Sequence, residues 1–262
     1  GGSIDVASGA YEHTVHVQPK GQAVTAFVMQ GRYPGFALGI AKSRAATYKS
    51  PKDLKGRLIA LNTPASVLHF MLARLLETDG LTLNDIQTVN MAWPNMGPGL
   101  ETKALDGGMV VEPFAGQYSA KGISFPFRRA ADFMTKPPLE VSVVLFSKTW
   151  ADKNLDQAKA FTVAYLKGVR DYYDAMKGGP KRAEVIDICA KYTSLKDKAM
   201  YDKIQWSYMD PNAEISFEGL RDQQDWYAKA GYVATKADLE GVVDPRFLHH
   251  ALEKLGKIDA AK

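Results

Sequence analysis

The segment Thr63-Pro64-Ala65-Ser66 and the residues around it constrain the fold more than any other part of the chain. Residues 58–61 are apolar and predict a short buried strand, and the apolar residues after Ser66 recur at helical spacing. Thr63 is expected to cap this helix, with Pro64 in its first turn, where a missing N–H costs nothing. Free backbone N–H groups at such a helix start can hold an anion or a polar ligand atom. An ordinary helix start in an α/β protein explains the same residues, so the rest of the chain has to separate the two interpretations.

Composition excludes several classes of protein. The chain has 262 residues, of which 46% are hydrophobic and 24% charged, so it can bury a core in one large domain or two lobes. The formal net charge of +4 is spread along the chain, and a nucleic-acid partner is not expected. Cys189 is the single cysteine, which rules out an internal disulfide. Apolar runs stay well below the roughly 20 residues that span a bilayer, and the first residues lack the pattern of an export signal.

The order of the predicted elements indicates two lobes. Short apolar runs alternate with helical patterns in the first half, which predicts α/β layers around a largely parallel sheet. From Leu155 onward the pattern is helical only, as in a tail that packs around the lobes. Strands predicted at residues 36–41 and 141–146 are expected to cross between lobes and to permit a hinge. We expect lobe 1 to comprise residues 1–40 and about 171–262, and lobe 2 about 41–170. The predicted tail helices are 156–176, 182–192, 196–206, 217–230 and 245–255.

Five short motifs occur in a characteristic order and spacing. They are residues 2–9 (GSIDVASG), 50–57 (SPKDLKGR), 80–86 (GLTLNDI), 112–114 (EPF) and 243–247 (VDPRF). Together they resemble the periplasmic solute-binding proteins of ABC importers in the nitrate, sulfonate and taurine branch, whose fold is shared with thiamine-pyrimidine synthases. The resemblance covers nearly the whole chain. It implies an α/β fold of the type II periplasmic binding class, with two lobes, hinge strands and a helical C-terminal tail.

The resemblance also implies a function. It makes the chain an extracytoplasmic solute-binding component of an ABC transporter, not an enzyme, with no cofactor and no catalytic residue. Its partners would be a small-molecule ligand and the transporter permease in the membrane, and the protein would be a periplasmic monomer. Family members carry a strand, helix, strand and helix ahead of the segment that matches residues 2–5. The resemblance therefore implies that an N-terminal segment of lobe 1 is missing from this sequence.

Four residues of lobe 1 are candidates for ligand contact. Gly9, Ala10 and Tyr11 follow the first predicted strand and open a helix, so their N–H groups and the Tyr11 ring are expected to face the cleft between the lobes. Plain packing explains them equally well. Gln30 ends a strand near the first lobe crossing, and Arg32 beside it is expected in solvent, with pairing to a ligand acid as the alternative.

The candidates of lobe 2 follow predicted strands. Thr63, Pro64, Ala65 and Ser66 form the helix start described above. Trp93 comes just after a strand at residues 88–92, where it can stack on a flat ligand, although a core position is nearly as well supported. Glu112 stands before a proline at another strand-to-helix junction, which lies close to the ligand in the family; capping that helix is the alternative.

These residues leave the ligand open. Helix starts favour an anion, whereas the Glu112 carboxylate favours an amine, an amidine or a hydroxyl, so a zwitterion such as an aminosulfonate and an aminopyrimidine both fit. The ligand class therefore spans sulfonates, taurine-like compounds, carboxylates and pyrimidines. No metal site is expected, because His13 and His16 share a helix face without a further ligand.

Two other functions are alternatives to solute binding. A thiamine-pyrimidine synthase-like enzyme shares the fold, but that family carries a cysteine-rich signature that Cys189 alone cannot supply. A periplasmic ligand-sensing module would use the same lobe closure and would normally continue into a membrane helix or a signalling domain. Phosphate-cradling glycine loops and hydrolase motifs do not occur in the sequence. Capture and delivery of a solute needs the fewest assumptions.

Overall fold

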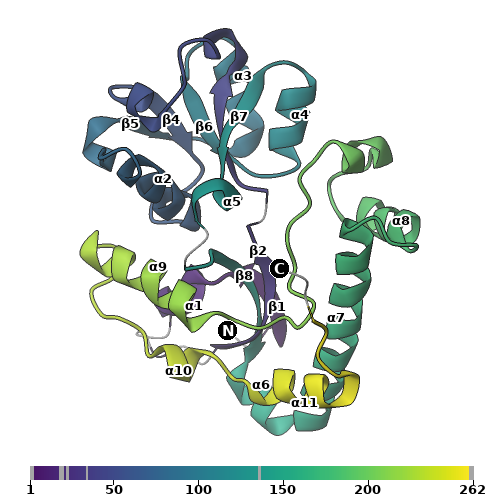
Figure 1. Ribbon diagram of the computed structural model, residues 1–262. Helices are drawn as coiled ribbons and strands as arrows, with labels where there is room; N and C mark the ends of the chain where they lie inside the picture. Colours follow the sequence, from purple (N-terminus) through teal and green to yellow (C-terminus); the bar gives the residue numbers. More distant parts are fainter. Residues whose placement is uncertain (1–2, 18–20, 22–23, 34, 135–136, 260–262) are drawn as a thin grey trace. The chain divides into compact units, whose positions relative to one another are not determined.

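A computed structural model describes residues 3–17, 21, 24–33, 35–134 and 137–259 (Figure 1). The chain divides into two compact units, and each is described by itself. Unit 1 comprises Gly1–Arg32, Lys136–Lys191 and Ser207–Lys262, and unit 2 comprises Tyr33–Thr135 and Tyr192–Trp206.

Unit 1 contains a three-stranded sheet. Its order is β1 (Val6–Ala10), β8 (Glu140–Ser147) and β2 (Val24–Arg32), and β8 is antiparallel to both neighbours. The predicted strand at 141–146 is thus confirmed as the central strand of this sheet. Because its pairing holds it inside unit 1, residues 137–170 group with this unit, whereas the sequence placed them in lobe 2.

Helices cover both faces of the unit 1 sheet. Val144 and Phe146 of β8 belong to a core cluster with residues of α7 and α11, and the Phe146 ring stacks on Phe27 at 3.7 Å between centroids. Val143 and Leu145 point into a second cluster, together with residues of α1, α9 and α10. Alternate residues therefore enter different cores, which explains why residues 143–146 of β8 are all apolar. The helices are α1 (Glu12–Val17), α6 (Lys148–Lys153), α7 (Leu155–Met176), α8 (Arg182–Tyr192), α9 (Phe217–Lys229), α10 (Leu239–Val242) and α11 (Arg246–Leu255).

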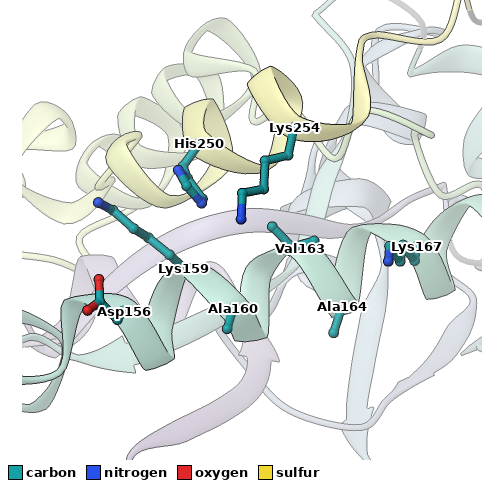
Figure 2. Close-up of a pocket in the computed structure, with 8 residues that line it drawn as sticks. All are labelled: Asp156, Lys159, Ala160, Val163, Ala164, Lys167, His250 and Lys254. Atoms are coloured by element: carbon teal, nitrogen blue, oxygen red, sulfur yellow. The ribbon is translucent and has the colours of Figure 1, made fainter.

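The helical tail agrees closely with the sequence patterns. The predicted helices over 156–176, 182–192, 217–230 and 245–255 are confirmed within one residue at each end as α7, α8, α9 and α11. The predicted helix over 196–206 is wrong, because only Lys198–Asp202 forms a 3-10 turn there. Helix α11 lies along α7 (Figure 2).

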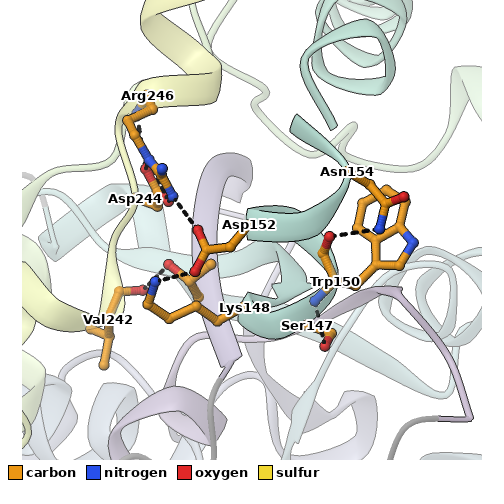
Figure 3. A network of polar contacts seen from close by, with 9 residues as sticks. Ser147, Lys148, Trp150, Asp152, Asn154, Val242, Asp244 and Arg246 are labelled. Carbon is orange, nitrogen blue, oxygen red and sulfur yellow. Dashed lines mark hydrogen bonds and ion pairs between the residues drawn. The ribbon is translucent and has the colours of Figure 1, made fainter. Parts of the chain in front are cut away.

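An ion-pair chain ties the start of α11 to α6 (Figure 3). Asp152 accepts from Lys148 at 2.7 Å and from Arg246 at 2.8 Å, and Arg246 also bonds Asp244. Ser147 caps α6 by accepting from the Trp150 N–H at 3.4 Å. Lys148, Asp152 and Arg246 are largely exposed, so we assign their ion pairs a modest share of the stability.

Unit 2 contains a five-stranded sheet. Its order is β5 (Gln87–Asn90), β4 (Leu58–Leu61), β6 (Gly107–Val110), β3 (Ala37–Ala41) and β7 (Ser124–Arg129). The helices of this unit are α2 (Val67–Glu77), α3 (Trp93–Glu101), α4 (Phe114–Ala120) and α5 (Ala130–Phe133), and 3-10 turns form at Lys42–Arg44, Pro51–Leu54 and Leu83–Asp85.

The largely parallel sheet expected from the sequence is only partly correct. Strand β4 pairs in parallel with β5 and β6, because α2 and α3 supply the crossover connections that parallel neighbours need. Strand β3 is antiparallel to both β6 and β7, and the whole sheet of unit 1 is antiparallel. The predicted strand at 36–41 is confirmed as β3, but it lies within unit 2, since the passage from unit 1 falls at Arg32–Tyr33.

Candidate functional site

The turn between β4 and α2 differs from its predicted geometry. Ser66 is the residue that caps α2, with its Oγ accepting from the His69 N–H at 3.4 Å and donating to the Thr63 carbonyl at 2.8 Å. Ala65 adopts a φ of +57°, and its N–H donates to His69 Nδ1 at 3.2 Å. The predicted cap at Thr63 and the placement of Pro64 in the first helical turn are therefore wrong. Both precede the helix, because the left-handed Ala65 reverses the chain before Ser66 begins it.

The start of α2 is suited to an anion. Burial lowers the pKa of His69, so the imidazole is neutral near pH 7 and its Nδ1 acts as an acceptor. The first turn of α2 carries no acidic side chain, so no carboxylate of that turn offsets the positive end of the helix dipole. Ser66 is half-buried and Thr63 is exposed, which leaves this turn open to a solute.

Glu112 is held by contacts within unit 2. Its Oε2 accepts from the Gly116 N–H at 2.8 Å, and its Oε1 accepts from the Gln205 N–H at 3.1 Å. Arg129 Nη1 lies 3.6 Å from the same Oε1 and donates to Gln205 Oε1 at 2.9 Å. The Glu112 side chain is only 9% exposed, and both of its oxygens have partners. This arrangement supports the capping interpretation of Glu112.

Trp93 is the first residue of α3. Its carbonyl accepts from the Tyr118 hydroxyl, and its ring centroid lies 6.3 Å from that of Phe114. The Trp93 Nε1–H is buried and has no hydrogen-bond partner among the described residues. The ring packs against a core cluster, as the core interpretation expects. Its polar edge has no hydrogen-bond partner among the described residues, as a ligand-contacting tryptophan would.

The candidates of unit 2 share one edge of the sheet. Thr63–Ser66 follows the carboxyl end of β4, Trp93 follows that of β5, and Glu112 follows that of β6. These three strands are adjacent and parallel, so the loops after them emerge on the same side. Ligands of open α/β sheets bind at this edge.

The candidates of unit 1 are less exposed than expected. Gly9 and Ala10 do not open a helix, because β1 continues through them and pairs with β8. Tyr11 is 0% exposed and packs with Val15, and its N–H donates to the Val141 carbonyl at 2.8 Å. Burial raises the pKa of Tyr11 far above its ordinary range, and a side-chain contact with Thr14 opposes that rise. The packing interpretation is therefore favoured for this ring.

Gln30 contacts Ser8, which directly precedes the candidates Gly9, Ala10 and Tyr11. Its Oε1 accepts a hydrogen bond from Ser8 Oγ, which joins the two outer strands of the unit 1 sheet. The alternation of side chains along β1 is the signal that could have shown Ser8 on one face of the sheet.

Arg32 is not a free surface cation. It donates to Glu140 Oε1 at 2.8 Å, to Asp210 Oδ2 at 3.2 Å and to the Glu214 carbonyl at 2.7 Å. The expectation that Arg32 remains in solvent is wrong. The Glu140 carboxyl group is fully buried and requires a partner, which Arg32 supplies. Burial raises the pKa of Glu140 to about 7, although Arg32 and the Ser216 N–H oppose that rise.

Residues 3–17, 21, 24–33, 35–134 and 137–259 contain no group of three metal-ligating side chains. Cys189 lies half-buried on α8, and burial raises the pKa of its thiol. Among the described helices, none is long and apolar enough to cross a membrane.

The fold is that of the type II periplasmic binding proteins. The periplasmic aliphatic sulphonate binding protein SsuA from Escherichia coli matches with a TM-score of 0.74 at 19% identity, over 95% of this chain and 82% of that one. The periplasmic nitrate-binding protein NrtA from Synechocystis PCC 6803 matches with a TM-score of 0.70 at 15% identity, over 97% and 75%. The desulfurization enzyme DSZB also matches, with a TM-score of 0.70 at 14% identity, over 95% and 85%.

A family model described as NMT1/THI5 like matches residues 1–180, so the chain belongs to the NMT1/THI5-like family. The resemblance drawn from the five sequence motifs is thereby confirmed. A comparison with curated proteins gives no match.

Proposed function

We propose that this protein is the solute-binding component of an ABC importer, acting outside the cytoplasm as a monomer and delivering its ligand unchanged to a membrane permease. The observation that carries the proposal is the convergence of three loops at the carboxyl edge of β5, β4 and β6. The fold supports it, because SsuA and NrtA are periplasmic binding proteins for a sulphonate and for nitrate.

The chemistry of unit 2 favours an anionic ligand. Ser66 offers a hydroxyl, and the start of α2 offers N–H groups without an acidic side chain in the first turn. Glu112 is only 9% exposed and accepts hydrogen bonds from the Gly116 and Gln205 N–H groups, so we do not assign it the role of selecting an amine. We therefore place a sulfonate or a carboxylate ahead of a taurine-like zwitterion or a pyrimidine.

Contacts from the other candidates complete the proposal. Trp93 would contact the ligand through its ring edge, where the buried Nε1–H has no partner among the described residues. In unit 1, Gln30 with its partner Ser8 is favoured over Gly9, Ala10 and the buried Tyr11. Units 1 and 2 would correspond to the two lobes of the class.

A thermal-shift screen tests this function. The panel contains nitrate, taurine, alkanesulfonates, aromatic carboxylates and thiamine pyrimidines. A ligand at about 100 times its dissociation constant adds roughly 2.7 kcal/mol to the free energy of unfolding and raises the midpoint by several degrees. A selective shift by a sulfonate or a carboxylate is the expected result. A flat response from a folded sample would contradict the proposal.

An enzyme on the same fold is the second candidate, because DSZB is a structural neighbour. Incubating the protein with the ligand that gives the largest shift, followed by mass spectrometry of the ligand, separates the two functions. The binding-protein account expects the ligand to be recovered unchanged in stoichiometric yield. Turnover would assign an enzyme.

A further inference from the structure

A basic groove runs between α7 and α11 on unit 1, at residues that the proposed ligand site does not use. Its volume is about 530 Å³. Figure 2 shows Lys159 extending from α7 toward α11, while His250 and Lys254 extend from α11 toward α7. The complete lining is Asp156, Lys159, Ala160, Val163, Ala164, Lys167, His250 and Lys254.

The sequence of each helix explains the groove. Lining residues of α7 recur at intervals of three or four, which places them along one stripe of the helix. Ala160 and Ala164 are small, so they leave a depression where longer side chains would fill the space. His250 and Lys254 are four residues apart and share a face of α11. Val163 packs against the core cluster beneath and forms part of the floor.

The groove has an excess of positive charge. Three lysines line it, against the single carboxylate of Asp156. Lys159, Lys167 and Lys254 form no ion pair or hydrogen bond in the described structure, so Asp156 does not neutralise any of them. Three unneutralised ammonium groups around one concavity repel each other and favour an anion between them.

We propose that this groove binds a small polyanion carrying two or more phosphate or carboxylate groups. Lys159 and Lys167 are eight residues apart on α7, about 12 Å along the axis at 1.5 Å per residue, so a ligand with separated anionic groups matches their spacing better than a single small anion does. A volume of about 530 Å³ suits a small molecule. The site is separate from the start of α2, and its occupation would not require the solute.

Calorimetric titration with inorganic tripolyphosphate tests the groove directly. We expect binding that weakens as salt rises, and a loss of about tenfold or more in affinity for the double variant Lys159→Gln/Lys254→Gln, because charge-assisted contacts are removed. The matched control is Lys121→Gln/Lys229→Gln, which removes the same net charge from exposed lysines outside the groove. This control should bind as the unmodified protein does.

Three results would overturn the proposal. The first is no binding of tripolyphosphate by the folded protein, and the second is an equal loss in both double variants, which would indicate attraction to net charge alone. The third is binding to phosphatidylglycerol vesicles without binding to tripolyphosphate, which would assign the groove to a membrane surface. Circular dichroism of both variants establishes that they remain folded.

Discussion

Arg32 Nε lies 2.8 Å from Glu140 Oε1 and joins the last residue of β2 to the first residue of β8. Asp210 Oδ2, 3.2 Å from Arg32 Nη1, adds a third segment. Each of these segments adjoins a point where the chain passes between the two units. The Arg32–Glu140–Asp210 cluster therefore fixes three connecting segments onto unit 1.

The buried carboxyl of Glu140 predicts a pH dependence of stability. Burial raises the pKa of Glu140 from 4.5 to about 7 in the folded protein, so between these values the folded state binds more protons than the unfolded state. The contribution of Glu140 to the free energy of unfolding is fully present below about pH 4.5. It is lost as pH rises through about 7, a decline of roughly 3 kcal/mol.

Glu140→Gln should remove that decline, because glutamine does not titrate. Urea denaturation of both proteins from pH 4.5 to 8 measures the difference in the free energy of unfolding at each pH. The free energy of unfolding of the variant should increase relative to that of the unmodified protein as pH rises. Parallel curves over the whole range would contradict the assigned pKa direction.

Glu112 is a largely buried, hydrogen-bonded carboxylate in unit 2, as Glu140 is in unit 1. Glu112→Gln leaves one acceptor oxygen for two N–H donors, those of Gly116 and Gln205, and turns an amide NH₂ toward the other. We expect a loss of about 1.5–3 kcal/mol in the free energy of unfolding.

Glu77→Gln is the matched control for this change. Glu77 pairs with Arg74 at 2.7 Å with its side chain 47% exposed, so its loss should cost less than about 1 kcal/mol. Denaturant midpoints of the two variants give the comparison. Equal losses would show that Glu112 is not the internal clamp described above.

Gly35 predicts a steric requirement next to Glu112. It adopts a φ of +48°, and a Cβ at this position would overlap Glu112 Cγ and come within 3.0 Å of the Gln205 carbonyl oxygen. Gly122 also has a positive φ, +69°, but a Cβ there meets nothing within 4 Å. Gly122→Ala should cost about 1 kcal/mol from the backbone conformation alone. Gly35→Ala should cost about 1–3 kcal/mol more because of the overlap. Thermal unfolding of the pair measures the difference, and equal costs would refute the close approach.

Local sequence patterns predicted the helices of the C-terminal tail well. They did not predict which strands pair when those strands lie far apart in the sequence. Helix α7 follows from its periodic apolar residues, and Gly178, Gly179 and Pro180 mark its C-terminal end. The direction of β3 could not be read from its sequence, since it depends on pairing with β6 and β7. The extension of β1 through Gly9 and Ala10 likewise depends on β8, which lies far along the chain.

The candidate site was predictable in part. Three strand-to-helix junctions were found because proline and capping residues mark them, and the structure places them at one edge of a sheet. The cap of α2 was misplaced, because Thr63 and Ser66 are both good cap residues and the choice depends on the left-handed Ala65. The burial of Arg32 and of the Glu112 carboxylate depends on residues 93–182 positions away, which no local pattern reveals.

The start of α2 gives the most direct test of anion capture. Ser66→Asp keeps a good capping residue, so α2 should remain intact, but it places a carboxylate where the ligand's negative charge is proposed to lie. Ser147→Asp makes the same change at the cap of α6, at a residue that is not part of the proposed site, and serves as the control.

The decisive measurement is calorimetric titration of the sulfonate or carboxylate that gives the largest thermal shift into these two variants and the unmodified protein. The account predicts a loss of more than about a hundredfold in affinity for Ser66→Asp, because like charges are brought together, and unchanged affinity for Ser147→Asp. Unchanged affinity in a folded Ser66→Asp variant would contradict the assignment of the α2 start as the anion-binding element.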